Sequence, residues 1–246
     1  METNSKISKT QVDRLGERLK AGNYDDADLT LLDEYRRSFS YAYEMLVKKI
    51  QNRIPVEPTG RSGKSTKSIV EKLNRESIRL SQMQDIAGCR IVVLGIPTQN
   101  LIIRLFNEEF PEAHVDDRRI KPSYGYRAVH VIAEIDHKMI EVQVRTFLQN
   151  KWAELSEKLS EKLDVRIKYG GGSAEIQAIL AECSLEVKNY EELEQQISVF
   201  NASDTFSDQS KEMRDSMDRI RINWAVSFDN IVNFYLREEK KNDFFN

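Results

Sequence analysis

Met139-Ile-Glu-Val-Gln-Val-Arg145 alternates strictly between apolar and polar residues, the pattern of a β-strand with one buried face. The apolar positions are Ile140, Val142 and Val144, and the polar positions are Glu141, Gln143 and Arg145. Each set shares one face of the predicted sheet, because successive side chains of a strand point to opposite sides. Carboxylate, amide and guanidinium groups in a row can bind a metal ion, a base edge and a phosphate, and a solvated strand face is the alternative interpretation.

A second acidic stretch stands about fifty residues earlier. Asp85-Ile-Ala-Gly-Cys-Arg90 leads directly into the apolar run Arg90-Ile-Val-Val-Leu94, a candidate strand. Asp85 and Glu141 therefore each lie beside a predicted strand. Carboxylates that meet at a sheet can hold Mg²⁺ together with substrate phosphates. The sequence thus predicts a magnesium-phosphate site formed by residues remote in the chain.

The remaining periodicity predicts an α/β (α+β) domain, a small mixed sheet flanked by helices, with helical extensions at both ends. The predicted helices are 28–54, 65–77, 98–109, 147–163, 174–200 and 209–240, and the predicted strands are 90–94, 127–135 and 138–145. The last two strands form an antiparallel hairpin at Asp136-His137. Pro55 and Pro58 end the first helix, residues 59–63 form a loop, residues 168–173 form a glycine hinge, and residues 201–205 separate the last two helices. We divide the chain into an N-terminal segment (1–27), a catalytic domain (28–167) and a C-terminal helical extension (174–246).

Charge is balanced overall but unevenly distributed. The 246 residues include 37 basic and 40 acidic side chains. Residues 48–79 carry nine Lys or Arg against three acids, and residues 174–208 carry eight acids against Lys188 alone. A basic segment of this size suits a polyphosphate. The acidic segment could be an oligomerisation helix, but plain helix packing is the interpretation we favour.

Cysteine usage and the chain start bear on the compartment. Cys89 and Cys183 are too few for a disulfide framework and have no zinc-ligand spacing. Met1-Glu-Thr-Asn-Ser-Lys6 lacks the apolar core of a secretory signal, and no apolar run approaches the length of a membrane span. We expect a soluble, cytoplasmic protein.

Gly60-Arg-Ser-Gly-Lys-Ser65 invites comparison with a phosphate-binding loop. The GxxxxGK[ST] pattern would need its first glycine at position 58, where the chain has Pro58, and no predicted strand precedes the stretch. A Walker loop is therefore not expected. Lys64, Ser68 and Lys72 instead fall at steps of four, so they share one face of the following helix. Such a face can bind a triphosphate, and a solvated stripe is the alternative.

Four motifs in order resemble the synthetase domain of RelA/SpoT-type proteins. They are Lys64-Ser-x-x-Ser-Ile-x-x-Lys-Leu73, Asp85-Ile-Ala-Gly-x-Arg90, Gly125-Tyr-Arg-Ala-Val-His130 and Glu141-Val-Gln-Val-Arg-Thr146, followed by Trp152-Ala. The resemblance covers about residues 40–165 and is closest to the small alarmone synthetases. It implies a nucleotidyltransferase-like fold and transfer of the β,γ-pyrophosphate of ATP to a ribose 3′-hydroxyl.

The resemblance also implies roles for individual residues. Asp85 and Glu141 would hold Mg²⁺, and Glu141 could accept the hydroxyl proton. Lys64, Ser68, Lys72 and Arg75 would contact the ATP phosphates, Arg90 would stack on adenine, and Arg61 would replace an adenine-stacking arginine of the family that this chain lacks. Tyr124, Tyr126, Arg127, His130, Gln143 and Arg145 would bind or orient the acceptor, although His130 could equally be a core histidine.

Departures from the family pattern gather at the acceptor residues. The chain reads Tyr124-Gly-Tyr-Arg-Ala-Val-His130 where Asn-Gly-Tyr-Arg-Ser-Leu-His is usual, and Glu157 stands where His is common. This form resembles the toxic small alarmone synthetases, some of which modify the 3′ end of tRNA. We therefore expect the tRNA 3′-CCA end as the preferred acceptor, with GDP or GTP as the alternative, and a protein antitoxin and a homo-oligomer as partners. For such a toxin, the acidic segment 174–208 could also be an antitoxin-docking surface or a polyanion that competes with RNA for the basic segment. A catalytically inactive nucleotide- or RNA-binding module and a helical adaptor are the rival hypotheses.

Overall fold

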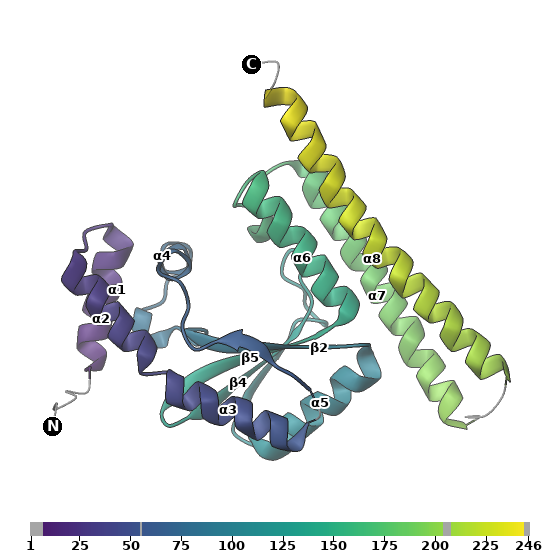
Figure 1. Ribbon diagram of the computed structural model, residues 1–246, viewed down its shortest axis with the longest axis horizontal. Coiled ribbons are helices and arrows are strands. Elements are labelled where there is room, and N and C mark those ends of the chain that lie inside the picture. The colour runs from purple at the N-terminus through teal and green to yellow at the C-terminus, as the bar shows by residue number, and fades with distance from the viewer. Residues whose placement is uncertain (1–6, 55, 204–207, 244–246) are drawn as a thin grey trace. The chain divides into compact units, whose positions relative to one another are not determined.

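The computed structural model describes residues 7–54, 56–203 and 208–243 (Figure 1). The expectations for Met1–Lys6, for Pro55 and for part of the segment between the last two helices fall outside these residues. The described helices are α1 (Lys9–Ala21), α2 (Asp26–Arg37), α3 (Ser40–Arg53), α4 (Thr66–Arg75), α5 (Ile96–Glu109), α6 (Phe147–Lys162), α7 (Ala174–Ser203) and α8 (Asp208–Asp243), with short turns η1 (Leu80–Gln82) and η2 (Ile167–Tyr169).

The strands form one five-stranded sheet, and the predicted mixed α/β class is confirmed. The strands are β1 (Thr59–Arg61), β2 (Ala87–Val93), β3 (His114–Asp117), β4 (Val129–Ile135) and β5 (Lys138–Thr146), in the spatial order β1-β2-β5-β4-β3. Strand β5 is therefore central. Its residues Ile140, Val142 and Val144 are fully buried, so the predicted apolar face is confirmed.

The β4–β5 hairpin is confirmed at the predicted turn. Asp136 and His137 have φ angles of 49° and 58°. Two central residues with positive φ are the mark of a type I′ turn, which matches the twist of antiparallel strands. Asp and His tolerate this left-handed conformation better than most residues.

Two sequence expectations are corrected. The predicted helix 28–54 is two helices, α2 and α3, because the chain turns at Ser38, whose hydroxyl bonds the Tyr35 carbonyl at 2.6 Å. The predicted loop 59–63 contains strand β1, which pairs antiparallel with β2. Gly60 permits this pairing, since a Cβ there would lie 2.7 Å from the Cβ of Cys89. Helix α1 and the edge strand β3 carried no signal that we recognised.

The chain divides into two compact units, which are described separately. The first comprises residues 1–91, 105–115 and 131–143, and the second comprises residues 92–104, 116–130 and 144–246. In the first unit, Leu15 and Leu19 of α1 are fully buried, and α1 packs against α2, α4 and η1. Gly16 allows the close approach, because a Cβ there would lie 2.7 Å from that of Leu80.

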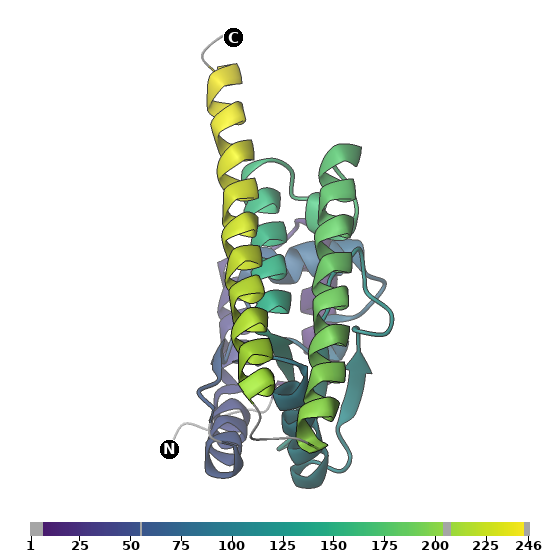
Figure 2. The same cartoon turned by 90° about the vertical axis from the view of Figure 1, so that its right-hand side faces the viewer.

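In the second unit, α6 packs against both α7 and α8, and Figure 2 shows the two long helices side by side. The core of this bundle is apolar and includes Trp152, Leu155, Leu159, Leu180, Val187 and Phe228. The predicted hinge at residues 168–173 is a hydrogen-bonded turn. Gln177 of α7 donates to the carbonyls of Ile167 and Gly171 at 2.8 and 2.7 Å. Cys89 and Cys183 are both buried and free. None of the described helices is both long and apolar enough to cross a bilayer.

Candidate functional site

Asp85 in the first unit is held by two lysines. Its carboxylate accepts hydrogen bonds from Lys64 Nζ at 2.7 Å and from Lys72 Nζ at 3.0 Å. Lys64 directly precedes Ser65, the N-cap of α4, and Lys72 lies in the last turn of that helix. Both lysines therefore reach the same carboxylate, although Lys64 lies just before the helix and not on its face as predicted. Their role in binding the ATP phosphates stays a prediction.

Burial opposes ionisation of Asp85, but the ammonium groups of Lys64 and Lys72 outweigh it and hold the pKa below its usual value. Lys72 also lies 3.9 Å from Glu76, which pairs with Arg75, so three cations face two carboxylates and a local positive charge remains. Such a charge suits a phosphate.

Glu141 of β5 lies next to the beginning of β2. A Cβ on Gly88 would lie 2.7 Å from the Glu141 carbonyl oxygen, and β2 and β5 are neighbours in the sheet. The Glu141 carboxylate accepts a hydrogen bond from Gln143 Nε2 at 2.8 Å. Asp85 stands three residues before Gly88, so both acidic residues belong to the same end of this strand pair.

The donor chemistry of these carboxylates fits Mg²⁺, which takes oxygen ligands from one or two carboxylates and completes its shell with substrate phosphates and water. No group of three or more His, Cys, Asp or Glu residues in the described part of the chain could form an all-protein metal cage. The Asp85 carboxylate is half-buried, and each of its two oxygens pairs with one lysine. Asp85 and Glu141 are the two residues that would hold such an ion, and this role stays a prediction.

The other predicted nucleotide-binding residues also lie in the first unit. Arg61 is exposed on β1, Ser68 lies on the first turn of α4, and Arg90 is half-buried on β2. Arg75 forms an ion pair with Glu76 at 2.8 Å. Arg36 of α2 was not predicted, yet it packs on Gly63 and donates to the Thr66 hydroxyl at the start of α4. The sequence offered no signal for Arg36 beyond its helical spacing.

Tyr126, His130 and Arg145 form a cluster in the second unit. The Tyr126 hydroxyl lies 2.9 Å from His130 Nε2 and accepts a hydrogen bond from Arg145 at 3.0 Å. The Arg145 guanidinium also lies over the Tyr126 ring, 5.1 Å from its centre. His130 and Arg145 are buried. These contacts fix the ring of Tyr126 and indicate a bracing role for both partners.

Tyr124 occupies the tip of a tight turn. The Tyr126 amide donates to the Ser123 carbonyl at 2.9 Å, and Tyr124 and Gly125 have φ angles of 53° and 88°. The turn is therefore type I′. A positive φ is unfavourable for tyrosine, and strained residues of this kind gather at functional sites. The Tyr124 side chain remains 64% exposed.

Arg127 points away from the turn tip. It donates to the Arg119 carbonyl at 2.7 Å and to the Ser184 hydroxyl of α7 at 3.1 Å. Its predicted role in acceptor binding stays a prediction, and its described contacts are internal. Ser184 is a further residue that the sequence did not single out.

Comparison with known proteins shows which family part of this chain resembles. Residues 60–164 match the family model of the region found in RelA / SpoT proteins. An uncharacterized protein of Mycobacterium tuberculosis is 38% identical over 112 residues, and the GTP pyrophosphokinase YwaC of Bacillus subtilis is 30% identical over 133 residues. These matches cover 43% and 47% of this chain. The chain spans only 40% of the mycobacterial relative and 63% of YwaC.

The fold of the RelA/SpoT region has a solved counterpart. The small alarmone synthetase 1 of Bacillus subtilis, bound to its product pppGpp, superimposes with a TM-score of 0.56 at 25% identity. That likeness covers 69% of this chain and 99% of the synthetase. The predicted resemblance to the RelA/SpoT synthetase domain is thus confirmed at the level of domain and fold.

Proposed function

We propose that this protein is an ATP-dependent pyrophosphokinase that transfers the β,γ-pyrophosphate of ATP to a ribose 3′-hydroxyl and releases AMP. The observation that carries the proposal is the contact of Lys64 and Lys72 with Asp85, next to the strand pair that bears Glu141. The match of residues 60–164 to the RelA/SpoT region and the named activity of its Bacillus relatives support the same reaction class.

In the proposed reaction the ribose 3′-oxygen attacks the β-phosphorus of ATP. The bond between that phosphorus and the oxygen bridging to the α-phosphorus breaks, and AMP leaves with the electron pair. The hydroxyl proton passes to the Glu141 carboxylate, which Gln143 orients through its hydrogen bond. Lys64 and Lys72 bind the phosphates and release Asp85. Mg²⁺ held by Asp85 and Glu141 would supply charge neutralisation at the phosphate oxygens.

We propose the tRNA 3′-CCA end as the preferred acceptor. The exposed ring of Tyr124 on a fixed turn supports this choice, because single-stranded RNA ends are commonly held by stacking on aromatic side chains. The basic segment gives weaker support than its charge count suggests. Six of its nine cations form ion pairs with acidic side chains: Lys49, Arg53, Lys64, Lys72, Arg75 and Arg79.

GDP or GTP is the second candidate acceptor. The specific support is the named activity of the Bacillus relatives and the pppGpp product bound in the similar synthetase.

A tRNA-modifying enzyme would block translation and act as a toxin, and a protein antitoxin would then be its partner. Expression of the chain alone tests that part: growth arrest is expected, and normal growth would contradict toxicity.

The acceptor is decided by incubating the protein with ATP labelled at the γ-phosphate and with either deacylated tRNA or GTP. Label in tRNA is expected, and label in the nucleotide alone would reject the tRNA acceptor.

Glu141→Gln should abolish pyrophosphate transfer and retain the fold. Glu134 is an exposed glutamate on β4, and Glu134→Gln should leave the rate of transfer unchanged. An unchanged rate in Glu141→Gln would contradict the proposed role. Calorimetry with a non-hydrolysable ATP analogue tests the rival hypotheses: an inactive module binds it without turnover, and an adaptor does not bind it.

A further inference from the structure

One face of helix α7 combines a core leucine with three polar side chains and contacts the rest of the second unit. Leu180, Ser184, Glu191 and Glu194 follow at steps of four, seven and three residues, so they lie on one side of the helix. Each contacts a different segment that precedes α7 in the chain. The acidic segment is therefore not only a solvated surface, because the side chains of Glu191 and Glu194 point inward.

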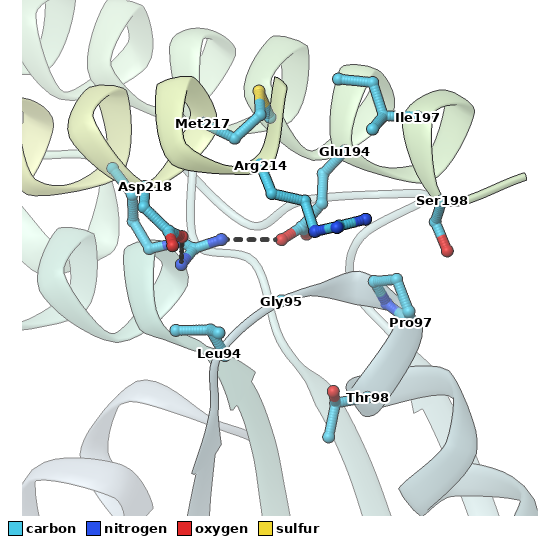
Figure 3. Close-up of a pocket in the computed structure, with 11 residues that line it drawn as sticks. Leu94, Gly95, Pro97, Thr98, Glu194, Ile197, Ser198, Arg214, Met217 and Asp218 are labelled. Atoms are coloured by element: carbon cyan, nitrogen blue, oxygen red, sulfur yellow. Dashed lines mark hydrogen bonds and ion pairs between the residues drawn. The ribbon is translucent and has the colours of Figure 1, made fainter. Parts of the chain in front are cut away.

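The two glutamates hold the ends of neighbouring elements. Glu191 lies 2.6 Å from the Thr146 hydroxyl, at the end of β5. Glu194 accepts the Ile96 amide at 2.8 Å, where α5 begins, and pairs with Arg221 of α8 at 3.0 Å. Glu194 and Arg221 line a cavity of about 450 Å³. The ion pair between them is drawn as a dashed line in Figure 3. The buried charges at that cavity pair with one another, so they mark bracing contacts of α7 and no particular ligand.

Ser184 makes the contact that bears on the acceptor residues. Its hydroxyl is buried, donates to the Gly125 carbonyl at 2.6 Å and accepts from Arg127 Nε at 3.1 Å. A serine hydroxyl has one hydrogen to donate, and Ser184 gives it to the centre of the type I′ turn. The turn is thus fixed at two consecutive points, Gly125 and Arg127, by a single side chain of α7.

Packing reinforces these bonds. A Cβ on Gly125 would lie 2.8 Å from the Trp152 ring, and the Trp152 indole donates to the Leu180 carbonyl at 2.8 Å. The Tyr124 ring lies against Gly170, where any side chain would collide with it. Tyr124 keeps its unfavourable φ because surrounding contacts determine the turn. These contacts come largely from segments outside the four family motifs.

We propose that Ser184 is a positioning residue for the acceptor, which holds the turn at Tyr124–Arg127 in the conformation that presents Tyr124 and Tyr126. This inference rests on the proposed pyrophosphokinase function. Loss of the hydroxyl leaves the Gly125 carbonyl and Arg127 Nε without their partner and loosens the turn. Acceptor binding should weaken, while the ATP residues of the first unit are unaffected.

The test compares Ser184→Ala with Ser184→Thr, which retains a hydroxyl, and with Ser198→Ala, which removes an exposed hydroxyl from the same helix. We expect KM for the acceptor to rise about tenfold in Ser184→Ala, with kcat and the affinity for a non-hydrolysable ATP analogue unchanged. Ser184→Thr should recover most of the loss, and Ser198→Ala should match the parent protein. An acceptor KM unchanged in Ser184→Ala, or raised equally in Ser198→Ala, would overturn the proposal.

A second measurement separates this inference from the proposed function. Hydrogen exchange at the amides of residues 123–127 should accelerate in Ser184→Ala and not in Ser198→Ala, whatever the reaction is. If the parent protein transfers pyrophosphate to neither acceptor, the proposed function fails, and the exchange result still decides whether Ser184 holds the turn. Unchanged exchange in Ser184→Ala rejects the positioning role even in an active enzyme.

Discussion

Glu191→Gln should change how the stability of this protein depends on pH. Burial raises the pKa of the Glu191 carboxyl from 4.5 to about 7, and the hydrogen bonds of Thr146 and Gln149 only partly offset it. Between these two values the folded state holds a proton that the unfolded state has released. The free energy of unfolding therefore falls as pH rises through this window, and it is highest below pH 4.5 as far as this group is concerned.

The size of the effect follows from the shift. One pKa unit corresponds to about 1.4 kcal/mol, so the rise to about 7 amounts to about 3 kcal/mol across the window. Glutamine is neutral at every pH and can reproduce both contacts, with its amide nitrogen facing the Thr146 hydroxyl and its oxygen facing Gln149 Nε2. Relative to the parent protein, Glu191→Gln should therefore gain about 3 kcal/mol between about pH 4.5 and about pH 7.

Urea unfolding followed by circular dichroism at several pH values within and above this window measures the difference. Glu192→Gln is the matched control, because Glu192 is an exposed neighbour on α7 that pairs with Lys188. Its stability curve should run parallel to that of the parent protein. If the free energy of unfolding of Glu191→Gln also ran parallel to that of the parent protein, Glu191 would not hold a proton in the folded state between these pH values.

Other perturbations test the two units separately. Lys72→Ala should weaken the binding of a non-hydrolysable ATP analogue about tenfold, as measured by calorimetry. Lys67 is an exposed neighbour on α4, and the Lys67→Ala variant should bind the analogue normally. Equal affinities in the two variants would show that Lys72 does not bind the phosphates. Gly125→Ala should lower the free energy of unfolding, measured by denaturation, by about 1–3 kcal/mol. Gly22→Ala should lower it less, because both glycines have positive φ but only Gly125 of the two lacks space for a Cβ. Equal losses in the two variants would contradict the packing argument. His137→Gly should stabilise the hairpin by about 1 kcal/mol, since position 137 has a φ of 58°; a lower melting temperature would contradict the assigned turn.

The sequence predicted those features that depend on local pattern. Strict alternation placed Ile140, Val142 and Val144 on one face, and all three are buried. The four-residue spacing grouped Lys64 with Lys72, but it did not predict that both would contact Asp85. The break between α2 and α3 was not predictable, because the apolar spacing continues through Ser38 and only a local hydrogen bond marks the turn. Strand β1 is three exposed residues long, so its pairing with β2 is visible only in the folded chain.

The sequence by itself determined the fold class of this protein, because a central alternating strand, two acidic stretches and the helical spacing of the lysines are all visible in local periodicity. Only the tertiary structure decided what α7 does. A helical period shows which residues share a face, but it does not show what that face meets. That Ser184 reaches the turn at Gly125, and that Glu191 is buried against Thr146, depend on long-range packing of segments about forty-five to sixty residues apart.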